Sequence, residues 1–365
     1  MIYFDNSATT MFKPDSVIDR VTDYLKHSGN PGRGVNAASL YSGSIVYDTR
    51  VKVAEFFHFN DPSRVIFTSG VTESLNTVIN SVVSSNDHVV ISYLEHNSVL
   101  RPLYHSGCSI SVTDGSIKEI SKKIQKNTKC VIINHCSNVT GEIQDLKAIG
   151  NFCKDKSILF IVDCAQSAGI VDIDVVENNI DILAFTGHKA MLGMQGIGGI
   201  LVNSHIKIEP LKRGGTGIHS FDKDMPEKYP EHLEAGTLNV PGIVSINAGI
   251  DYINDYGVEN IYSHELSLRN YLLSYLATRK NVSVYKNDNK SAIGVVSFNF
   301  NDVDSAKLSD YLSTQHNIAI RSGAHCAPLA LKHYNIESCA RISFGINNTK
   351  KEIDILISAL DQFVF

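Results

Sequence analysis

An aspartate and a lysine, each placed after an apolar stretch, form a pair that could carry out chemistry. Asp163 directly follows the stretch Ile158–Val162, and Lys189 stands shortly after the stretch Ile182–Phe185. Both stretches are typical of buried strands, and the strands of a parallel sheet end at the edge where ligands bind. A carboxylate suits a protonated ring nitrogen and an amine suits an aldehyde. The pair therefore indicates a pyridine cofactor that carries an aldehyde group.

Each member of this pair also has an ordinary interpretation. Asp163 alone could cap a helix or bind a metal, and Lys189 alone could be a surface lysine. However, Lys189 follows an apolar strand and lies among small residues, which is a poor place for a hydrated amine. Partial burial would lower its pKa and free the amine for covalent chemistry. Gln166 stands close enough to Asp163 in the sequence to reach a hydroxyl group on the same ring.

A short segment, Ser69–Leu75, could bind an anion. It follows the apolar stretch Val65–Thr68, and Gly70 permits a tight turn into a helix. The backbone N–H groups at the start of that helix, with the Thr72 hydroxyl, could hold a phosphate. An ordinary capped turn explains the same residues. The glycine run Gly193–Gly199 lacks the spacing of a dinucleotide-binding fingerprint, and it favours a tight turn into the next strand.

Two further side chains are candidates for catalysis. His96 follows the stretch His88–Ile91 on the ligand side of the sheet, where an imidazole could stack on a flat ring or serve a structural purpose. Cys326 lies in a loop beside His325 and near Arg321, and nearby positive charge lowers the pKa of a thiol. A single cysteine is more often a small core residue. Among the seven cysteines, Cys326 is nevertheless the best candidate nucleophile.

Arg341 lies inside a strand-like apolar run near the end of the chain. A buried arginine requires a carboxylate, which could belong to a structural partner or to a substrate. A zinc site remains an alternative use of this region, but the spacing of its candidate ligands matches no standard zinc finger. We therefore predict no metal site. Those candidate ligands are His325, Cys326, His333 and Cys339.

The composition excludes several classes of function. The chain has 365 residues with 33 Lys plus Arg and 38 Asp plus Glu, a net charge of −5, which argues against a nucleic-acid partner. No apolar run approaches the roughly 18 residues that a membrane-spanning helix needs. The N-terminus lacks the pattern of a signal peptide, and the cysteines form no C-x-x-C pair. We expect free thiols in a reducing cytoplasm.

Strands and helices alternate through the first two thirds of the chain, which predicts a mostly parallel sheet with helices on both faces. Two helices, Pro14–His27 and Ser44–Phe57, precede it. We predict seven strands, at Val65–Thr68, His88–Ile91, Cys108–Val112, Cys130–Asn134, Ile158–Val162, Ile182–Phe185 and Gly199–Val202. Helices are predicted between them at Thr72–Val83, Ile117–Ile124 and Asp145–Lys154.

The last third predicts a smaller α+β domain. A long surface loop, Lys212–Pro241, precedes it, and such loops are more often functional than idle. We expect a large domain over residues 13–245, and a small one formed by residues 1–12 and 246–365. The predicted elements of the small domain are Ile243–Tyr256, His264–Thr278, Gly294–Phe300, Ile318–Arg321 and Lys351–Phe363.

Taken in this order, the motifs resemble those of class V aminotransferase-like enzymes, which have the pyridoxal phosphate (PLP) fold of type I. Within that family the chain looks most like the cysteine desulfurase and selenocysteine lyase group. The resemblance implies an α/β fold with a large seven-stranded domain and a smaller C-terminal α+β domain. It rests on Tyr3–Thr10, Asn30–Gly34, Ser69–Leu75, Glu95–Ser98, Ser137–Gly141, the runs at Asp163 and Lys189, Glu234–Thr237, the Cys326 loop and Arg341–Thr349.

The resemblance implies a role for each matching residue around the cofactor. Lys189 would carry PLP, Asp163 would pair with its pyridinium nitrogen, and Gln166 would bind the ring oxygen. His96 would stack on the ring. Thr237 would reach the phosphate of a neighbouring subunit, which implies a homodimer with shared sites. The phosphate would otherwise be held by Val71, Thr72, Thr186 and His188.

The resemblance also implies a reaction. Asn138 and Arg341 would bind the carboxylate of L-cysteine, and Lys189 would remove its Cα proton. Cys326 would take the sulfur as a persulfide, and L-alanine would be released. The sulfur would then pass from Cys326 to an acceptor, such as an acceptor protein. The alternatives are selenocysteine lysis, with selenocysteine as substrate, transamination, epimerisation, or a non-catalytic PLP-binding sulfur carrier.

The chain departs from the family pattern in two places. Asn36 stands where the second group of desulfurases usually has a histidine in its Arg-Gly-x-His motif. The segment Lys332–Ala340 is short and irregular beside its relatives, so the supports of the Cys326 loop do not follow from the resemblance.

Overall fold

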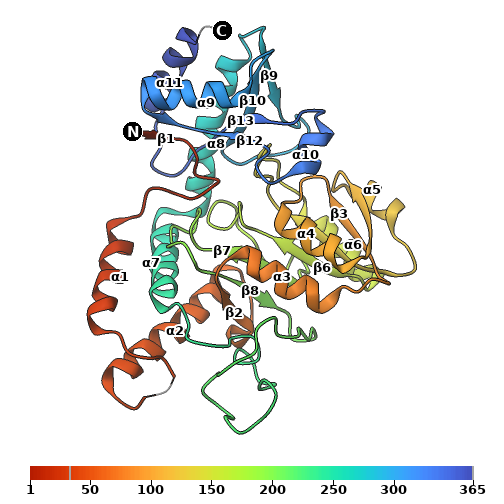
Figure 1. Cartoon of the computed structure of the whole chain (residues 1–365), viewed down its shortest axis with the longest axis vertical. Helices are drawn as coiled ribbons and strands as arrows, with labels where there is room; N and C mark the ends of the chain where they lie inside the picture. Colours follow the sequence, from red (N-terminus) through yellow and green to blue (C-terminus); the bar gives the residue numbers. More distant parts are fainter. Residues whose placement is uncertain (33, 364–365) are drawn as a thin grey trace.

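The computed structural model describes residues 1–32 and 34–363. Arg33, within the Asn30–Gly34 motif, lies outside the described residues. The described chain forms a large sheet covered by helices, and a smaller sheet with its own helices above it (Figure 1). None of the described helices has the length and apolar character needed to cross a membrane.

The large sheet has seven strands in the order β2-β8-β7-β6-β5-β3-β4. All neighbouring strands are parallel except at β8, which runs antiparallel to both β2 and β7. The prediction of a mostly parallel α/β sheet is confirmed, and each strand lies within one or two residues of its predicted bounds. The strands are β2 (Val65–Thr68), β3 (His88–Ser92), β4 (Ser109–Thr113), β5 (Thr128–Asn134), β6 (Leu159–Asp163), β7 (Ile182–Thr186) and β8 (Gly198–Val202).

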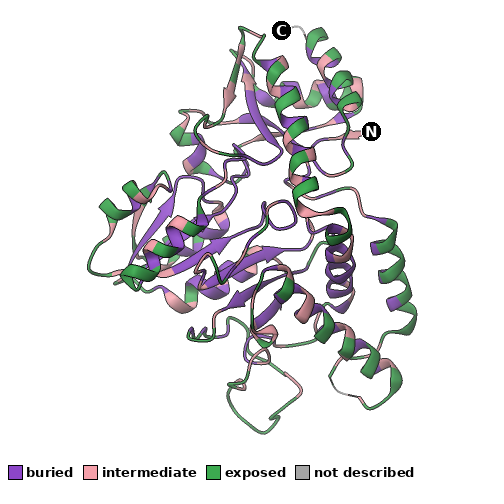
Figure 2. Cartoon of the chain, turned by 180° about the vertical axis from the view of Figure 1, so that it is seen from behind, coloured by how far each residue is buried: buried purple, intermediate pink, exposed green. Residues whose placement is uncertain are grey.

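The central strands are apolar on both faces because helices cover both sides of the sheet. In β7, Leu183 and Phe185 join the core on one face, whereas Ile182 and Ala184 join the core on the other. This alternation follows from the two-residue repeat of a strand. Figure 2 shows the resulting pattern of buried strands beneath helices whose outer faces are exposed.

The helices that pack against the large sheet divide between its two faces. Residues of α1, α2, α5, α6 and α7 join one core, and residues of α3 and α4 join the other. The sequence did not predict α4, which contains Pro102. The bounds are α1 (Asp15–His27), α2 (Ala37–Phe56), α3 (Val71–Val82), α4 (Asn97–Ser106), α5 (Ile117–Lys123), α6 (Leu146–Lys156) and α7 (Val240–Tyr256), with a 3₁₀ turn at Pro62–Arg64.

The predicted start of the second helix at Ser44 is wrong, since α2 begins at Ala37. Asn36 precedes it in an extended conformation, and the Asn36 side chain accepts a hydrogen bond from the N–H of Ser39 at 3.0 Å. Asparagine is among the best residues for this capping position. The residue that replaces the family histidine therefore has a structural use in this chain.

The smaller sheet is antiparallel, with the order β12-β13-β10-β9. The predicted strand Ile318–Arg321 is two strands, because β11 pairs with β1 at the start of the chain whereas β12 pairs with β13. The exact domain boundaries stay a prediction. The elements are β1 (Ile2–Tyr3), α8 (Val258–Leu276), β9 (Val282–Tyr285), β10 (Val295–Phe300), α9 (Ser305–His316), β11 (Ile318–Ala319), β12 (Arg321–Gly323), α10 (Pro328–His333), β13 (Cys339–Ser343) and α11 (Lys350–Gln362).

The long loop is confirmed, since residues 203–239 contain no helix or strand. A buried ion pair ties this loop to the sheet. The Glu234 carboxylate accepts hydrogen bonds from Arg50 Nη1 at 2.8 Å and from the N–H of Phe67 at 2.7 Å. Because both charged side chains are nearly inaccessible to solvent, removal of either would leave the other charge buried without a partner.

We predict that Glu234→Ala lowers the free energy of unfolding by about 3–5 kcal/mol, because Arg50 would keep its buried charge without compensation. Urea denaturation of the purified protein measures this change. The exposed pair Lys122–Glu119 provides the control, since Glu119→Ala should cost less than about 1 kcal/mol. Equal effects of the two substitutions would contradict the role given to the buried pair.

Candidate active site

The aspartate and the lysine of the opening pair meet at one edge of the large sheet. Asp163 is the last residue of β6, and Lys189 follows the end of β7, the parallel neighbour of β6. Burial lowers the pKa of Lys189 to about 8; the Asp163 carboxylate opposes this shift, whereas Arg341 and Arg321 add to it. Burial raises the pKa of Asp163, against the Ala165 N–H and the Lys189 charge. The two groups therefore interact electrostatically.

A corner suited to an anion lies beside this pair. The helix α3 begins at Val71, directly after Gly70, whose φ of 149° lies in a region that favours glycine. A Cβ atom on Gly70 would lie 3.6 Å from the Thr186 hydroxyl at the end of β7. The first N–H groups of a helix have no partner within the helix. Val71, Thr72 and Thr186 therefore face a common corner where an oxyanion can bind.

The imidazole of His96 is neutral and fixed in direction. His96 caps α4, and its Nδ1 accepts a hydrogen bond from the N–H of Ser98 at 3.1 Å, which places the ring proton on Nε2. Burial lowers the pKa of His96 to about 4, and the Lys189 charge adds to the shift. His96 therefore presents an uncharged ring close to the Lys189 amine.

A second buried carboxyl group lies next to Asp163, and the sequence had given it no role. Glu95 Oε1 accepts hydrogen bonds from Ser92 Oγ at 2.6 Å and from the N–H of Asn134 at 2.9 Å. Burial raises the pKa of Glu95 to about 8, against those two hydrogen bonds, and the Asp163 charge raises it further. At neutral pH Glu95 is therefore mostly protonated.

The Cys326 thiol opens into the same region as His96. Cys326 is the one exposed cysteine among the seven, and all seven are free thiols. Its carbonyl oxygen accepts a hydrogen bond from the N–H of Asn97 at 2.8 Å, at the start of α4. Cys326, His96 and Thr72 line one cavity of about 390 Å³, together with Arg101. The structure thus brings the candidate nucleophile to the stacking histidine and the anion corner.

The Cys326 loop is held in place by a set of hydrogen bonds. His325 and Cys326 have φ angles of 49° and 56°, a left-handed conformation that costs energy for residues other than glycine. Asn138 Nδ2 donates to the His325 carbonyl at 2.7 Å, and His325 Nε2 donates to the Cys339 carbonyl at 2.9 Å. These contacts stabilise the strained turn that exposes the thiol.

The short segment after this loop also has supports. The ring of His333 stacks on Tyr93, at the end of β3, with the ring centres 4.0 Å apart. The Tyr93 hydroxyl donates to the Glu142 carboxylate at 3.0 Å. Ala327, Ala330 and Leu331 pack beside Tyr93 in a small core of their own. The helix α10 is therefore attached to the large domain directly behind the thiol.

Arg341 lies in a place fit for a carboxylate ligand. It is 1% exposed, and it donates from Nη2 to Asp5 Oδ1 at 2.5 Å and from Nη1 to the Asn138 carbonyl at 3.1 Å. In the described part of the chain, Arg341 Nε and Asn138 Oδ1 are buried without a hydrogen-bond partner. Arg321 lies opposite Arg341 in the register of β12 and β13. Of these two guanidinium groups, that of Arg341 forms the ion pair with the Asp5 carboxylate.

The remaining predicted residues divide into two groups. Gln166 Nε2 donates to the Ser7 carbonyl at 3.0 Å, and His188 Nδ1 lies 3.0 Å from Thr9 Oγ1. Both therefore contact the N-terminal segment, a motif for which sequence reasoning had found no use. Thr237 is exposed and lines a different cavity, of about 750 Å³, so the structure does not bring it to the other site residues within one chain.

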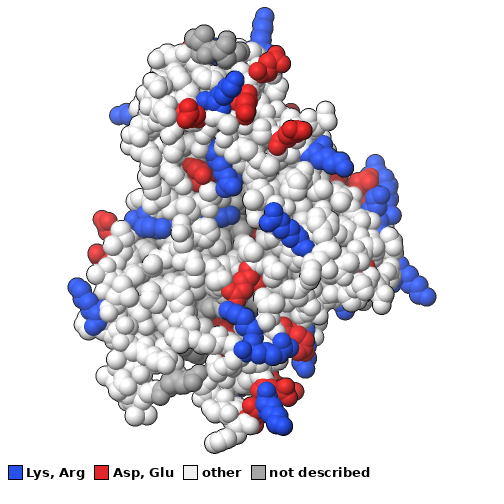
Figure 3. Space-filling view, viewed as in Figure 1, with Lys and Arg blue, Asp and Glu red and all other residues white. Residues whose placement is uncertain are grey.

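The zinc alternative finds no support in residues 1–32 and 34–363, which contain no group of three or more His, Cys, Asp or Glu side chains arranged to hold a metal. His325 uses Nε2 to bind a backbone carbonyl instead. Positive and negative side chains are interspersed over the face shown in Figure 3, as expected from the small net charge.

Comparison with curated proteins finds relatives that match over nearly the whole chain. A probable cysteine desulfurase of Methanothermobacter thermautotrophicus is 31% identical over 379 residues, which cover 99% of this chain and 94% of the relative. A probable cysteine desulfurase of Halalkalibacterium halodurans is 34% identical, with 99% and 93% covered.

The chain is also similar to solved structures of cysteine desulfurases. The apo structure of a cysteine desulfurase from Thermococcus onnurineus matches with a TM-score of 0.91 and 31% identity, over 99% of this chain and 94% of the other. The cysteine desulfurase CsdA of Escherichia coli, in an S-sulfonic acid form, matches with a TM-score of 0.88 and 27% identity, over the same shares. The aminotransferase class-V family profile matches residues 2–356. The chain belongs to the aminotransferase class-V family.

Proposed function

We propose that this chain is a PLP-dependent cysteine desulfurase. It converts L-cysteine to L-alanine and takes the sulfur onto Cys326 as a persulfide, which then passes to an acceptor. The observation that carries the proposal is the position of Cys326, an exposed cysteine that lines one cavity with His96 and Thr72. The names of the relatives and the solved structures support the same activity.

The residues at the sheet edge fit PLP. The buried Asp163 carboxylate lacks a cationic hydrogen-bond partner among the described residues, and a pyridinium N–H would supply one. Lys189 would hold the aldehyde carbon, His96 would cover the ring and Gln166 would bind its oxygen. The phosphate would occupy the corner formed by Val71, Thr72, Thr186 and His188. When bound, PLP draws electrons from the substrate Cα and so acidifies its proton.

Lys189 is suited to move that proton. An ordinary lysine is almost entirely protonated at neutral pH, whereas a pKa of about 8 leaves a useful fraction of neutral amine. The Asp163 carboxylate raises the pKa of this amine and the Arg341 guanidinium lowers it, so both groups interact with the amine electrostatically. We assign to Lys189 both the attachment of the cofactor and the removal of the Cα proton.

Cys326 carries out the sulfur chemistry. Its thiolate attacks the substrate sulfur, and a sulfur–sulfur bond forms while the bond from sulfur to Cβ breaks. The electrons of the broken bond stay with Cβ, which takes up a proton and becomes the methyl group of alanine, and Cα regains the proton that Lys189 removed. Arg341 and Asn138 would hold the substrate carboxylate, since both have buried polar atoms without partners in the described chain.

We also propose a homodimer in the cytoplasm. Thr237 is exposed on the long loop and lines a cavity apart from the other phosphate-binding candidates, which supports a role at the site of a second copy. The buried Arg50–Glu234 pair holds this loop against the sheet. The seven free thiols suit a reducing compartment.

We predict that Cys326→Ala lowers alanine formation from L-cysteine by about 100-fold or more, because the acceptor of the sulfur is lost. The visible absorbance of bound PLP should not change. The matched control is Cys108→Ala, which removes a half-buried thiol outside the site. Alanine is quantified in the presence of a reductant, and a full rate in Cys326→Ala would rule out the persulfide step.

We predict that Lys189→Ala abolishes the absorbance band near the visible edge, because no amine remains to bind the PLP aldehyde. Lys118→Ala, on the exposed side of α5, serves as the control and should keep the band. A wild-type protein that stays colourless after incubation with PLP would contradict the proposed cofactor.

We predict that PLP-free protein takes up PLP faster as the pH rises, with a midpoint near 8. The neutral amine is the reactive form, and burial lowers the pKa of Lys189 to about 8, so that form predominates above this pH. Stopped-flow absorbance at several pH values measures the rate. A midpoint near that of an exposed lysine would show that the amine is not buried in solution.

A further inference from the structure

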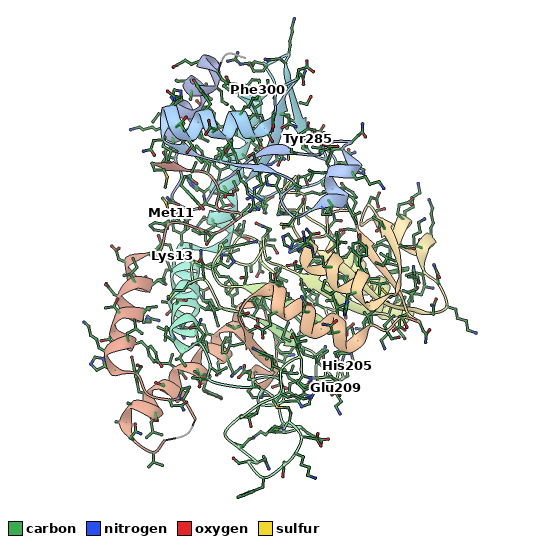
Figure 4. All side chains as sticks on the ribbon, viewed as in Figure 1. Met11, Lys13, His205, Glu209, Tyr285 and Phe300 are labelled. Atoms are coloured by element: carbon green, nitrogen blue, oxygen red, sulfur yellow. The ribbon has the colours of Figure 1, made fainter. Side chains whose placement is uncertain are left out.

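The N-terminal segment crosses the active site and contacts it at three points. We call Asp5–Lys13 the N-terminal strap. It leaves β1 beside the small sheet and runs to α1, as the positions of Met11 and Lys13 show in Figure 4. The strap belongs to the motif that the sequence resemblance singled out without giving it a function.

The first contact fixes the guanidinium group of Arg341. Asp5 Oδ1 accepts from Nη2 at 2.5 Å, and the Asn138 carbonyl accepts from Nη1 at 3.1 Å. Nε is buried without a partner in the described part of the chain. Partners at both Nη atoms set the orientation of this planar group, and Nε remains for a ligand.

Asp5 also affects the net charge around the Arg341 guanidinium group. Burial lowers the pKa of Arg341, and the Asp5 carboxylate opposes that shift. Arg321, across the strand pair, adds a second positive charge. Asp5 therefore compensates one of two cations, which leaves a net positive site for one further carboxylate.

The strap makes its other two contacts at the cofactor end of the site. Gln166 Nε2 donates to the Ser7 carbonyl at 3.0 Å. Thr9 Oγ1 lies 3.0 Å from His188 Nδ1 and 3.2 Å from the His188 carbonyl. These contacts would influence how PLP is held, whereas the Asp5 contact would influence how the substrate is held.

We propose that the strap is part of the active site, and that Asp5 is a positioning residue that directs Arg341 toward the α-carboxylate of the amino-acid substrate. This inference rests on the proposed function, since it takes an α-amino acid as the ligand of Arg341. Asp5 need not touch the substrate. It acts through the guanidinium group that does.

The test is Asp5→Asn in the PLP-loaded enzyme. We expect KM for L-cysteine to rise about tenfold, the scale of one lost hydrogen bond between charged groups, with kcat within about twofold. The visible band and the thermal midpoint should not change. Asp5→Glu, which keeps the carboxylate, should recover part of the KM. Asp19→Asn, an exposed aspartate on α1, makes the same charge change and should leave both constants unaltered.

A second measurement separates this proposal from the proposed function. L-Alanine bears the α-carboxylate but no sulfur, so its dissociation constant, followed by the visible band, reports on Arg341 without desulfuration. Asp5→Asn should weaken L-alanine binding about tenfold even if the enzyme released no sulfur. Thr9→Val should instead increase the rate of PLP loss, because it removes the contact with His188.

Three results would overturn the proposal. The first is an unchanged or lowered KM in Asp5→Asn, which would mean that Asp5 is idle or competes with the substrate. The second is that Asp5→Asn lowers both kcat and the midpoint temperature of thermal unfolding, which would indicate a purely structural role. The third is unaltered L-alanine binding in a variant that keeps its visible band.

Discussion

The parallel pairing of β6 with β7 is the constraint on which the rest of the site depends. It places Asp163 at one strand end and Lys189 just beyond the next, so that a buried carboxylate and a buried amine influence each other. Neither charge would be stable alone in this position. Together they form a polar pair that the proposed pyridinium cofactor with its aldehyde would complete, because it would offer a cation to one group and a carbon to the other.

The residues proposed to determine the reaction lie outside that pair, in elements that the small domain contributes. The Cys326 loop keeps a left-handed turn because Asn138 and Asn97 hold its backbone and the His325 side chain bonds to the Cys339 carbonyl. Arg341 comes from β13 of the same small sheet. The large domain thus supplies the residues proposed to hold the cofactor, and the small domain supplies the proposed nucleophile and the proposed carboxylate-binding arginine.

Much of the large domain was predictable because its strands are continuous apolar runs between turn residues. The helix α4 was missed because it begins with the polar residues Asn97 and Ser98 and contains Pro102. The strand Ile318–Arg321 was wrong as one unit, since its halves pair with different strands. The Asp5–Arg341 contact joins residues 336 positions apart, and no local pattern reveals such a pair. The position of Glu95 next to Asp163 likewise depends on the order of strands in the sheet.

The central claim is that Lys189 and Cys326 act on one substrate, and mass spectrometry of Cys326 tests it most directly. The PLP-loaded protein is mixed with L-cysteine without reductant, and the peptide that contains Cys326 is weighed. We predict the addition of one sulfur atom to Cys326 in the wild type and no addition in Lys189→Ala. Alanine formation with an unmodified Cys326, or with the sulfur on another cysteine, would contradict this account.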